Sequence, residues 1–475
     1  MEKMAKDLHV MMLPWSAFGH LIPFFHLSIA LAKAGVKISF VSTPKNIQRL
    51  PKIPSNLETL INFVEFSLPT PQDESLPEGA EATVDIPPEK IPFLKIAYDL
   101  LQYPLNKFVA DQRPDWIIID LVSHWMVDIS RENNVPLLYF SVFSAASFLF
   151  LGHPGCLAGD SQKNLRPSWE SMTSPPEWVD FPSSVAFRKH EAIGAFEWIY
   201  GTNASGISDA ERVATILNSC QGMVIRSCTE FEGDYLTSLN KIMKKPVVPL
   251  GLLPIVKPKA RQITDGSWGE IFDWLDQQKR KSVIFVSFGS EFKLTRDQVY
   301  EIAYGLELSG LPFLWALRKP NWAIDDVDAL PLGFSQRTRG KGIVSIGWAP
   351  QMEILGHPSI GGSLFHSGWG SIIETLEFGH SLILLPFIID QPLNARYLVE
   401  KGLGVEVERS EDGSFSRDGI AKALRVAMVR EEGKELRARA NEAAKIFGDE
   451  KLHQEHYIGK FVEFLKSYYE DHKDC

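Results

Sequence analysis

Cysteine and long apolar runs are both scarce in this sequence. Its 475 residues include only four cysteines, and their spacing matches neither a metal site nor a disulfide framework. The longest apolar stretch, residues 140–151, is interrupted by serines and is too short to span a bilayer. The apolar run before Pro14 is likewise too short for the core of a signal peptide. These absences predict a cytoplasmic protein with no membrane insertion.

Positive charge is also in the minority. The chain has 49 Lys and Arg residues against 59 Asp and Glu residues, which gives a formal net charge of -10. A nucleic-acid-binding protein is expected to present a basic face, so we expect no nucleic-acid partner. Hydrophobic residues make up 45% of the sequence, and a chain of this length exceeds one ordinary core. The composition therefore predicts a globular protein of two domains.

Strand-like and helix-like patterns alternate along most of the chain, which is typical of a doubly wound α/β fold. A Pro- and Lys-rich stretch interrupts the alternation, which begins again near residue 281. We therefore predict four segments, namely a Rossmann-like N-terminal domain at 1–248, a linker at 249–262, a Rossmann-like C-terminal domain at 263–455 and a final helix at 456–475.

The segment 348–391, with the sequence WAPQMEILGHPSIGGSLFHSGWGSIIETLEFGHSLILLPFIIDQ, is the most informative part of the chain. In its middle the small and apolar run 360–365 gives way to a turn of small residues and then to apolar residues at helical spacing, which predicts a strand, a turn and a helix. Free backbone N–H groups at such a turn favour a phosphate, and His366 is placed to add a donor. Ser371 and Glu374 also have the spacing of a helix capping box, which is the alternative interpretation.

Both ends of this segment carry residues suited to a ligand. Trp348 is followed by Ala349 and a rigid Pro350 turn, where a nucleotide base can stack on the indole, although a lone Trp is more often part of a core. Asp390 and Gln391 follow a strand-like run at 382–387, and ligands of open α/β sheets bind at the carboxyl ends of strands. A carboxylate beside an amide suits the hydroxyls of a sugar.

Other strand ends carry further candidates. A small-residue turn that includes Ser290 follows the apolar run 283–286, and its alternative interpretation is a simple tight connection. His20 follows a predicted strand at 9–13, and Asp120 follows the apolar run 116–119. A carboxylate that accepts an imidazole N–H leaves the other ring nitrogen as a base. The rival histidines are His26, expected on a flanking helix face, and His124, beyond a strand end.

The 44-residue segment 348–391 resembles the signature box of the plant family-1 UDP-dependent glycosyltransferases. It matches at the opening Trp, the His, the Gly-Trp pair, the Glu and the closing Asp-Gln. The resemblance implies a GT-B fold, in which two Rossmann-like doubly wound domains face each other across a cleft. The donor would bind the C-terminal domain and the acceptor mostly the N-terminal one, and the last helix would return to the N-terminal domain.

The same resemblance assigns individual residues to parts of a UDP-sugar donor. The uracil and ribose would be contacted by Trp348, Ala349, Gln351 and Glu374. The diphosphate would be held by Ser290, His366, Gly370 and Ser371. The transferred sugar would face Trp369, Asp390 and Gln391.

The family also implies a catalytic role for His20 and Asp120. The His would deprotonate an acceptor hydroxyl for in-line attack on the anomeric carbon, with inversion of configuration. No metal or other cofactor is expected, because the phosphate turn supplies positive potential. The Asp-x-Asp pattern at 326–328 imitates the metal site of another glycosyltransferase fold, but its polar surroundings indicate a solvated loop. We expect a monomer.

The sequence departs from the family pattern at three places. It has Ser367 where Cys is usual, Gly370 where Asn is usual, and a His-Ser pair at 380–381 where Val-Pro is usual. Its turn resembles the branch of the family that adds a sugar to the sugar of a glycoside. An aromatic-rich segment at 167–200 would help to enclose the acceptor, expected to be a flavonoid or terpenoid glycoside. Gln391 favours UDP-glucose as donor, while UDP-rhamnose, UDP-xylose and a bare aglycone acceptor stay open.

Two other classes of protein fit the sequence less well. A nucleotide-sugar-binding protein without catalysis would keep the box but lose His20 and Asp120, which are both present. A Rossmann dehydrogenase would need a G-x-G-x-x-G motif after the first strand, and residues 15–19 (WSAFG) do not provide it.

Overall fold

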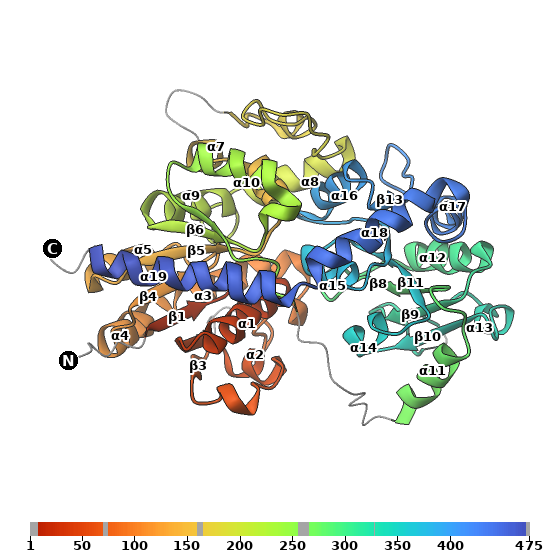
Figure 1. Cartoon of the computed structure of the whole chain (residues 1–475), viewed down its shortest axis with the longest axis horizontal. Coiled ribbons are helices and arrows are strands. Elements are labelled where there is room, and N and C mark those ends of the chain that lie inside the picture. The colour runs from red at the N-terminus through yellow and green to blue at the C-terminus, as the bar shows by residue number, and fades with distance from the viewer. Residues whose placement is uncertain (1–7, 70–74, 159–164, 255–265, 327, 472–475) are drawn as a thin grey trace. The chain divides into compact units, whose positions relative to one another are not determined.

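The computed structural model describes residues 8–69, 75–158, 165–254, 266–326 and 328–471 (Figure 1). Contacts between Cα atoms divide the chain into two compact units. Unit 1 consists of Met1–Pro182, Gly194–Leu253 and Glu450–Cys475, and unit 2 consists of Ser183–Ile193 and Pro254–Asp449. The division after Leu253 falls within the segment predicted as a linker, 249–262, of which residues 255–262 lie outside the described part of the chain.

Unit 1 is built on a seven-stranded parallel sheet with the strand order β3-β2-β1-β4-β5-β6-β7. Its strands are β1 (His9–Leu13), β2 (Lys37–Ser42), β3 (Ile61–Glu65), β4 (Trp116–Ile119), β5 (Leu137–Ser141), β6 (Gly222–Ile225) and β7 (Val247–Pro249). Its helices before β5 are α1 (Phe18–Lys33), α2 (Pro44–Arg49), α3 (Ile91–Asp99), α4 (Gln102–Gln112) and α5 (Met126–Asn133). The later ones are α6 (Ala145–Leu151), α7 (Pro154–Leu157), α8 (Lys189–Tyr200), which starts in the unit 2 segment, α9 (Asp209–Ser219) and α10 (Thr229–Met243). Short 3-10 turns are η1 (Ser55–Leu57), η2 (Thr83–Asp85), η3 (Pro88–Lys90) and η4 (Trp169–Met172).

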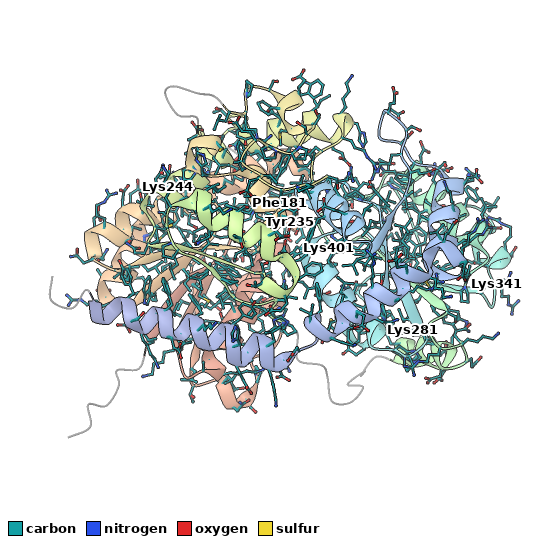
Figure 2. All side chains as sticks on the ribbon, turned by 45° about the horizontal axis from the view of Figure 1, so that its top comes forward. Phe181, Tyr235, Lys244, Lys281, Lys341 and Lys401 are labelled. Atoms are coloured by element: carbon teal, nitrogen blue, oxygen red, sulfur yellow. The ribbon has the colours of Figure 1, made fainter. Side chains whose placement is uncertain are left out.

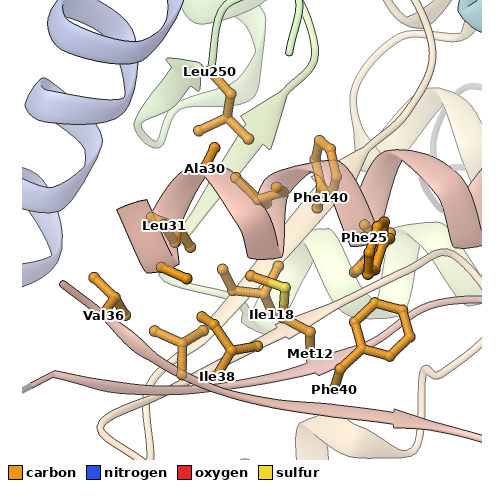
Figure 3. Close-up of a cluster of buried hydrophobic side chains, with 14 of the residues drawn as sticks. Met12, Phe25, Ala30, Leu31, Val36, Ile38, Phe40, Ile118, Phe140 and Leu250 are labelled. Atoms are coloured by element: carbon orange, nitrogen blue, oxygen red, sulfur yellow. The ribbon is translucent and has the colours of Figure 1, made fainter. Parts of the chain in front are cut away.

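The core of unit 1 lies between the sheet and the helices that cover it. Strands β4 and β5 are buried along their whole length, as expected of parallel strands covered on both faces. Helix α1 packs its apolar side chains on the sheet, and Figure 3 shows Phe25, Ala30 and Leu31 of this helix above Met12 and Ile118 of the strands.

The last segment of the chain completes unit 1. It comprises the π-helical turn η6 (Lys451–Ile458) and α19 (Gly459–Asp471). The indole Nε1 of Trp116 donates a hydrogen bond to the carbonyl of Leu465 at 3.1 Å, and its ring lies 4.8 Å from the ring of Tyr468. Phe461 is fully buried in the same core. Helix α19 therefore packs on β4, and the contacts assign it to unit 1 from Glu450 onward.

Unit 2 is a second doubly wound domain, with a six-stranded parallel sheet in the order β10-β9-β8-β11-β12-β13. Its strands are β8 (Val283–Ser287), β9 (Phe313–Leu317), β10 (Gly342–Ile346), β11 (Ile360–Phe365), β12 (Ser381–Leu384) and β13 (Gly404–Glu406). Its helices before β12 are α11 (Gly266–Asp276), α12 (Arg296–Ser309), α13 (Phe334–Arg337), α14 (Gln351–Leu355) and α15 (Trp369–Glu377). The later elements are α16 (Gln391–Glu400), α17 (Arg417–Met428), η5 (Glu431–Gly433) and α18 (Lys434–Phe447).

The two sheets share the feature that fixes where a ligand binds. In unit 1, β1 pairs with both β2 and β4, and in unit 2, β8 pairs with both β9 and β11. The strand order reverses at these pairs, and ligands of open α/β sheets bind beyond the carboxyl ends of the strands at such a switch point. The predicted doubly wound α/β fold with two Rossmann-like domains is confirmed.

Residues Ser183–Ile193 group with unit 2, a division that the sequence prediction does not contain. The segment is held by ion pairs: Arg396 donates to Glu191 at 2.7 Å and to Glu406 at 2.7 Å, and Arg188 donates to Glu406 at 3.0 Å. The side chains of Arg396, Glu191 and Glu406 are largely buried, whereas that of Arg188 is more exposed. None of the helices within the described ranges is long and apolar enough to cross a membrane.

Candidate functional site

The unit 1 candidates meet at the ends of β1 and β4. His20 is the third residue of α1, whose N-cap is Ala17, and Asp120 directly follows β4. Because β1 and β4 are neighbours, the two side chains come together although they are far apart in sequence. Nδ1 of His20 lies 2.8 Å from Oδ2 of Asp120, and the side chains are 11% and 1% exposed. The predicted pair is therefore formed in the structure.

Asp120 accepts hydrogen bonds from three donors. Besides His20, the backbone N–H of Trp15 donates to Oδ2 at 3.0 Å, and the N–H of Leu121 donates to Oδ1 at 2.7 Å. These hydrogen bonds fix the orientation of the carboxylate beside the imidazole ring. On the other side, the ring of Phe143 meets the His20 ring edge to face at 5.7 Å. The Trp15 and Phe143 contacts are not visible in the sequence, because each joins residues about a hundred or more positions apart along the chain.

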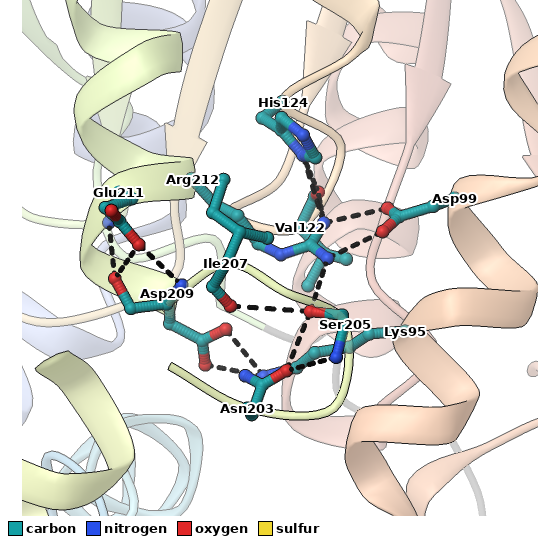
Figure 4. A network of polar contacts seen from close by, with 11 residues as sticks. Lys95, Asp99, Val122, His124, Asn203, Ser205, Ile207, Asp209, Glu211 and Arg212 are labelled. Carbon is teal, nitrogen blue, oxygen red and sulfur yellow. Dashed lines mark hydrogen bonds and ion pairs between the residues drawn. The ribbon is translucent and has the colours of Figure 1, made fainter. Parts of the chain in front are cut away.

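The rival histidines have other surroundings. His124 accepts a hydrogen bond at Nδ1 from Arg212 at 3.0 Å, and the same guanidinium donates to both carboxylate oxygens of Asp99 and to the carbonyl of Val122 (Figure 4). Burial and the charge of Arg212 lower the pKa of His124. Burial, with a smaller effect of the Arg226 charge, lowers the pKa of His26 to about 3. Among the described residues, neither ring has a hydrogen bond to a carboxylate like that of His20.

The unit 2 candidates gather at the ends of β8 and β11. His366 follows β11, and its ring lies between two glycines from different turns. A Cβ atom on Gly289, after β8, would lie 2.9 Å from Cε1 of His366, and one on Gly368 would lie 2.7 Å from Nε2. Gly289 has φ +68°, a left-handed conformation. Burial lowers the pKa of His366 to about 4, and its Nδ1 has no hydrogen-bond partner among the described residues.

Helix α15 begins earlier than the capping-box interpretation requires. Its N-cap is Gly368, which has no side chain to cap with, and Ser371 already lies within the first turn. The carboxylate of Glu374 instead accepts a hydrogen bond from Nε2 of Gln351 at 2.6 Å. The capping-box alternative is therefore wrong. Because the first N–H groups of a helix have no partner within the helix, those near Gly370 and Ser371 are available to an anion.

Trp348 stands at the exposed end of this site. It follows β10, is 77% exposed, and precedes Ala349, which packs partly against the core beneath it. A core role for this Trp is thereby excluded. Pro350 is the N-cap of α14, and Gln351 is the first residue of that helix. The exposed indole therefore belongs to the residue three positions before Gln351, which donates to Glu374.

Asp390 and Gln391 begin α16 but use their side chains differently. Oε1 of Gln391 accepts hydrogen bonds from the backbone N–H groups of Phe387 and Ile388, at 3.0 and 3.1 Å. Only the amide nitrogen of Gln391 is then left over for a ligand. Oδ2 of Asp390 accepts a hydrogen bond from Nδ2 of Asn394 at 2.7 Å. Trp369, which opens α15, is only 3% exposed.

The strand-like run 382–387 and the aromatic-rich segment 167–200 can both be compared with the structure. The strand-like run 382–387 ends as a strand at Leu384, because Pro386 has no N–H for the ladder. In the aromatic-rich segment 167–200, Phe181 packs edge to face on Tyr235 at 4.8 Å (Figure 2), and the indole of Trp178 donates to the carbonyl of Leu149 at 2.7 Å. These two aromatics pack within unit 1.

Within the described ranges, no group of three or more His, Cys, Asp and Glu side chains is placed to hold a metal ion. In the Asp-x-Asp pattern at 326–328, Asp326 is 68% exposed and lies 3.9 Å from Lys319. Val327 lies outside the described residues.

Known proteins share both the sequence and the fold. Residues 265–439 match the family model described as UDP-glucoronosyl and UDP-glucosyl transferase. UDP-glycosyltransferase 91A1 of Arabidopsis thaliana is 42% identical over 463 residues, which cover 96% of this chain and 96% of that protein. Soyasaponin III rhamnosyltransferase of Glycine max is 42% identical over 471 residues, which cover 98% of this chain and 96% of that protein.

Among solved structures, the fold is similar to the crystal structure of Glycyrrhiza uralensis UGT73P12 complexed with glycyrrhetinic acid 3-O-monoglucuronide. The TM-score is 0.79 at 24% sequence identity, and the match covers 97% of this chain and 96% of that chain. The two doubly wound units and near-complete coverage of curated relatives lead to the same assignment. The chain belongs to the plant family-1 UDP-glycosyltransferases, which have the GT-B fold, and is an enzyme that transfers a sugar from a UDP-sugar to a small molecule.

Proposed function

We propose that this enzyme transfers glucose from UDP-glucose to a sugar hydroxyl of a small plant glycoside, such as a flavonoid or terpenoid glycoside. The observation that carries the proposal is the His20–Asp120 pair, whose atoms are 2.8 Å apart at the strand switch point of unit 1. Asp120 is nearly inaccessible and receives two backbone N–H groups besides the imidazole. Such a carboxylate orients the ring and stabilises the imidazolium once a proton arrives.

The reaction follows from this pair. Nε2 of His20 takes the proton of the acceptor hydroxyl while the oxygen attacks the anomeric carbon of the donor. The bond from that carbon to the β-phosphate oxygen breaks, and its electron pair leaves with UDP. A single displacement inverts the anomeric configuration. General-base assistance of this kind is worth roughly 10²–10⁴-fold in rate.

On the donor side, the exposed indole of Trp348 would stack on the uracil, with Ala349 and Gln351 beside it. Glu374 would accept hydrogen bonds from the ribose hydroxyls. Because burial lowers its pKa to about 4, His366 is uncharged near neutral pH and would act as a hydrogen-bond donor. The remaining contacts in this assignment are the diphosphate with Ser290, Gly370 and Ser371, and the sugar with Trp369, Asp390 and Gln391.

The N–H groups of Gly370 and Ser371, in the first turn of α15, support binding of the departing UDP. They lie at a helix N-terminus, where the helix dipole favours negative charge. Charge develops on the leaving diphosphate as the bond breaks, so fixed donors at this position stabilise the transition state. This arrangement needs no divalent ion. We accordingly propose that the enzyme is metal-independent. From the sequence, we also propose that it works as a cytoplasmic monomer.

One observation supports an alternative donor sugar. A relative with 42% identity is named soyasaponin III rhamnosyltransferase, which gives rhamnose as the sugar and a saponin as the acceptor. UDP-rhamnose is therefore the main alternative to UDP-glucose, and UDP-xylose is a further one. The saponin acceptor of that relative, together with the turn built on Ser367 and Gly370, supports a glycoside acceptor over a bare aglycone.

The test of donor and acceptor is mass spectrometry of the product. UDP-glucose, UDP-rhamnose and UDP-xylose are each offered with a flavonoid or terpenoid aglycone and with its monoglucoside. We expect transfer of a hexose onto the monoglucoside only. A deoxyhexose or pentose increment would replace glucose as the donor sugar, and transfer onto the aglycone alone would contradict the glycoside acceptor.

Metal independence is tested in the same reaction. We expect EDTA to leave the rate unchanged, because the contacts proposed for the diphosphate are protein N–H groups and uncharged side chains. Loss of activity in EDTA that returns with magnesium or manganese would contradict this part of the proposal.

A further inference from the structure

Asn394 joins two segments that the proposed function assigns to different parts of the donor. It lies in the first helical turn of α16, outside the signature box, and is completely buried. Its Nδ2 donates to the carbonyl oxygen of Ser367 at 3.1 Å and to Oδ2 of Asp390 at 2.7 Å. We propose that Asn394 is a positioning residue that sets both the diphosphate turn and the sugar-binding carboxylate, an inference that rests on the proposed function.

The direction of the Asn394 amide is fixed by its partners. A backbone carbonyl oxygen and an ionised carboxylate can only accept hydrogen bonds. The atom that faces both Ser367 and Asp390 must therefore be the nitrogen, with one N–H for each. The hydrogen bond to Asp390 is made to a charge, which makes it the stronger of the two.

The hydrogen bond to Ser367 acts on the phosphate turn. Ser367 has φ +65°, a conformation that costs a non-glycine residue free energy and persists only where neighbours hold it. In a trans peptide the carbonyl and the following N–H point in opposite directions. By holding the carbonyl of Ser367, Asn394 fixes the orientation of the N–H of Gly368, the N-cap of α15.

The hydrogen bond to Asp390 acts on the sugar side. Asp390 follows Ile389, which has φ +55°, and the preceding N–H groups are held by Gln391. With Oδ2 held by Asn394, the orientation of the Asp390 carboxylate toward the sugar hydroxyls of the proposed function is fixed. A single side chain thus determines the geometry of the phosphate and sugar contacts together.

The test is calorimetric binding of UDP and UDP-glucose to Asn394→Leu, which keeps the branched shape but cannot donate. We expect UDP affinity to fall roughly 3- to 10-fold, the effect of one neutral hydrogen bond. We expect UDP-glucose affinity to fall roughly ten-fold further, because the charged hydrogen bond to Asp390 is also lost. The control is Thr338→Val, which removes a buried hydrogen bond to Phe334 elsewhere in unit 2.

A role limited to stability would lower the melting temperature of Asn394→Leu and Thr338→Val alike and leave both affinities unchanged, which would overturn the inference. Asp390→Ala separates it from the proposed function. If Asp390→Ala leaves the preference for UDP-glucose over UDP intact, Asp390 does not contact the sugar and the proposed function is wrong at that residue. If Asp390→Ala lowers the preference but Asn394→Leu does not, the inference alone is wrong.

When both residues are changed, we expect no further loss of the preference for UDP-glucose beyond that of Asp390→Ala. UDP affinity should still fall on adding Asn394→Leu, because the hydrogen bond to Ser367 is independent of Asp390. Additive losses of the sugar preference would show that the two side chains act separately and would contradict positioning through Asp390.

Discussion

The ring of His366 fills the space that a side chain on Gly289 would need, with Cε1 2.9 Å from the position of the missing Cβ. The two residues follow neighbouring strands, β11 and β8, so the turn after one strand closes over the histidine of the other. Because Gly289 also has a positive φ, two separate physical reasons require glycine there.

Gly289→Ala is expected to weaken UDP binding roughly ten-fold by displacing His366. The matched control is Gly310→Ala, because Gly310 has nearly the same φ, +70°, but no atom within 4 Å of a Cβ. Both variants should lose about 1 kcal/mol of unfolding free energy from the left-handed conformation, whereas only Gly289→Ala should lose UDP affinity. Calorimetry with UDP measures this, and equal affinities in the two variants would contradict a role for the His366 position.

His20→Gln is expected to lower kcat roughly 10²–10⁴-fold, because the general base is lost. The affinity for UDP should stay that of the parent enzyme, since His20 belongs to unit 1 and the proposed UDP contacts belong to unit 2. His26→Gln is the matched control on the same helix and should retain turnover. Single-turnover kinetics with UDP calorimetry measures both, and normal turnover in His20→Gln would exclude it as the base.

Trp348→Ala is expected to weaken UDP binding roughly 5- to 150-fold, the range that corresponds to stacking of one base on an aromatic ring. Since the indole is 77% exposed, the melting temperature should hardly change. Leu332→Ala, which removes another exposed apolar side chain of unit 2, should affect neither quantity. Unchanged UDP affinity in Trp348→Ala would refute the stacking contact.

His380→Val is expected to make the enzyme less sensitive to acid. Burial and, to a lesser extent, the charge of Lys281 lower the pKa of His380 to about 3, below the unfolded value of about 6.5. Between these values the unfolded chain binds a proton that the folded chain does not, so the unfolding free energy falls as the pH falls. From about pH 6.5 to pH 5 this one residue costs about 2 kcal/mol.

Urea unfolding of parent and His380→Val at about pH 7 and about pH 5 measures this difference. The other histidines with lowered pKa, among them His26, His124 and His366, are present in both proteins and cancel from the comparison. Equal losses of stability in the two proteins would show that His380 takes up its proton in the folded state.

The sequence predicts the fold well where local patterns decide it. The expected strands at 9–13, 116–119 and 360–365 coincide with β1, β4 and β11, because each is a short apolar run bounded by turn residues. The signature segment offers two interpretations of Trp348, base stacking beside a turn or part of a core, and its 77% exposure excludes the second. The start of α15 is predicted too late, since Gly368 carries no capping side chain that would mark it.

The sequence does not reveal contacts that depend on strand order. Asn394 reaches Ser367 because β12 lies beside β11, and Trp15 reaches Asp120 because β1 lies beside β4. Phe143 follows β5, which pairs with β4, and so reaches His20. No local pattern encodes such pairings. The segment Ser183–Ile193 is missed for the same reason, because its attachment to unit 2 depends on long-range ion pairs.

The polypeptide passes from one unit to the other four times, at Pro182, Ile193, Leu253 and Asp449. A chimera that exchanges halves with a related enzyme at Leu253 would therefore transplant a foreign C-terminal helix onto β4, at the Trp116–Leu465 contact. It would also pair the native 183–193 segment, through Glu191, with the foreign residue at position 396. Recombining donor and acceptor specificity between such enzymes therefore requires three exchanged pieces, each taken together with the unit on which it packs.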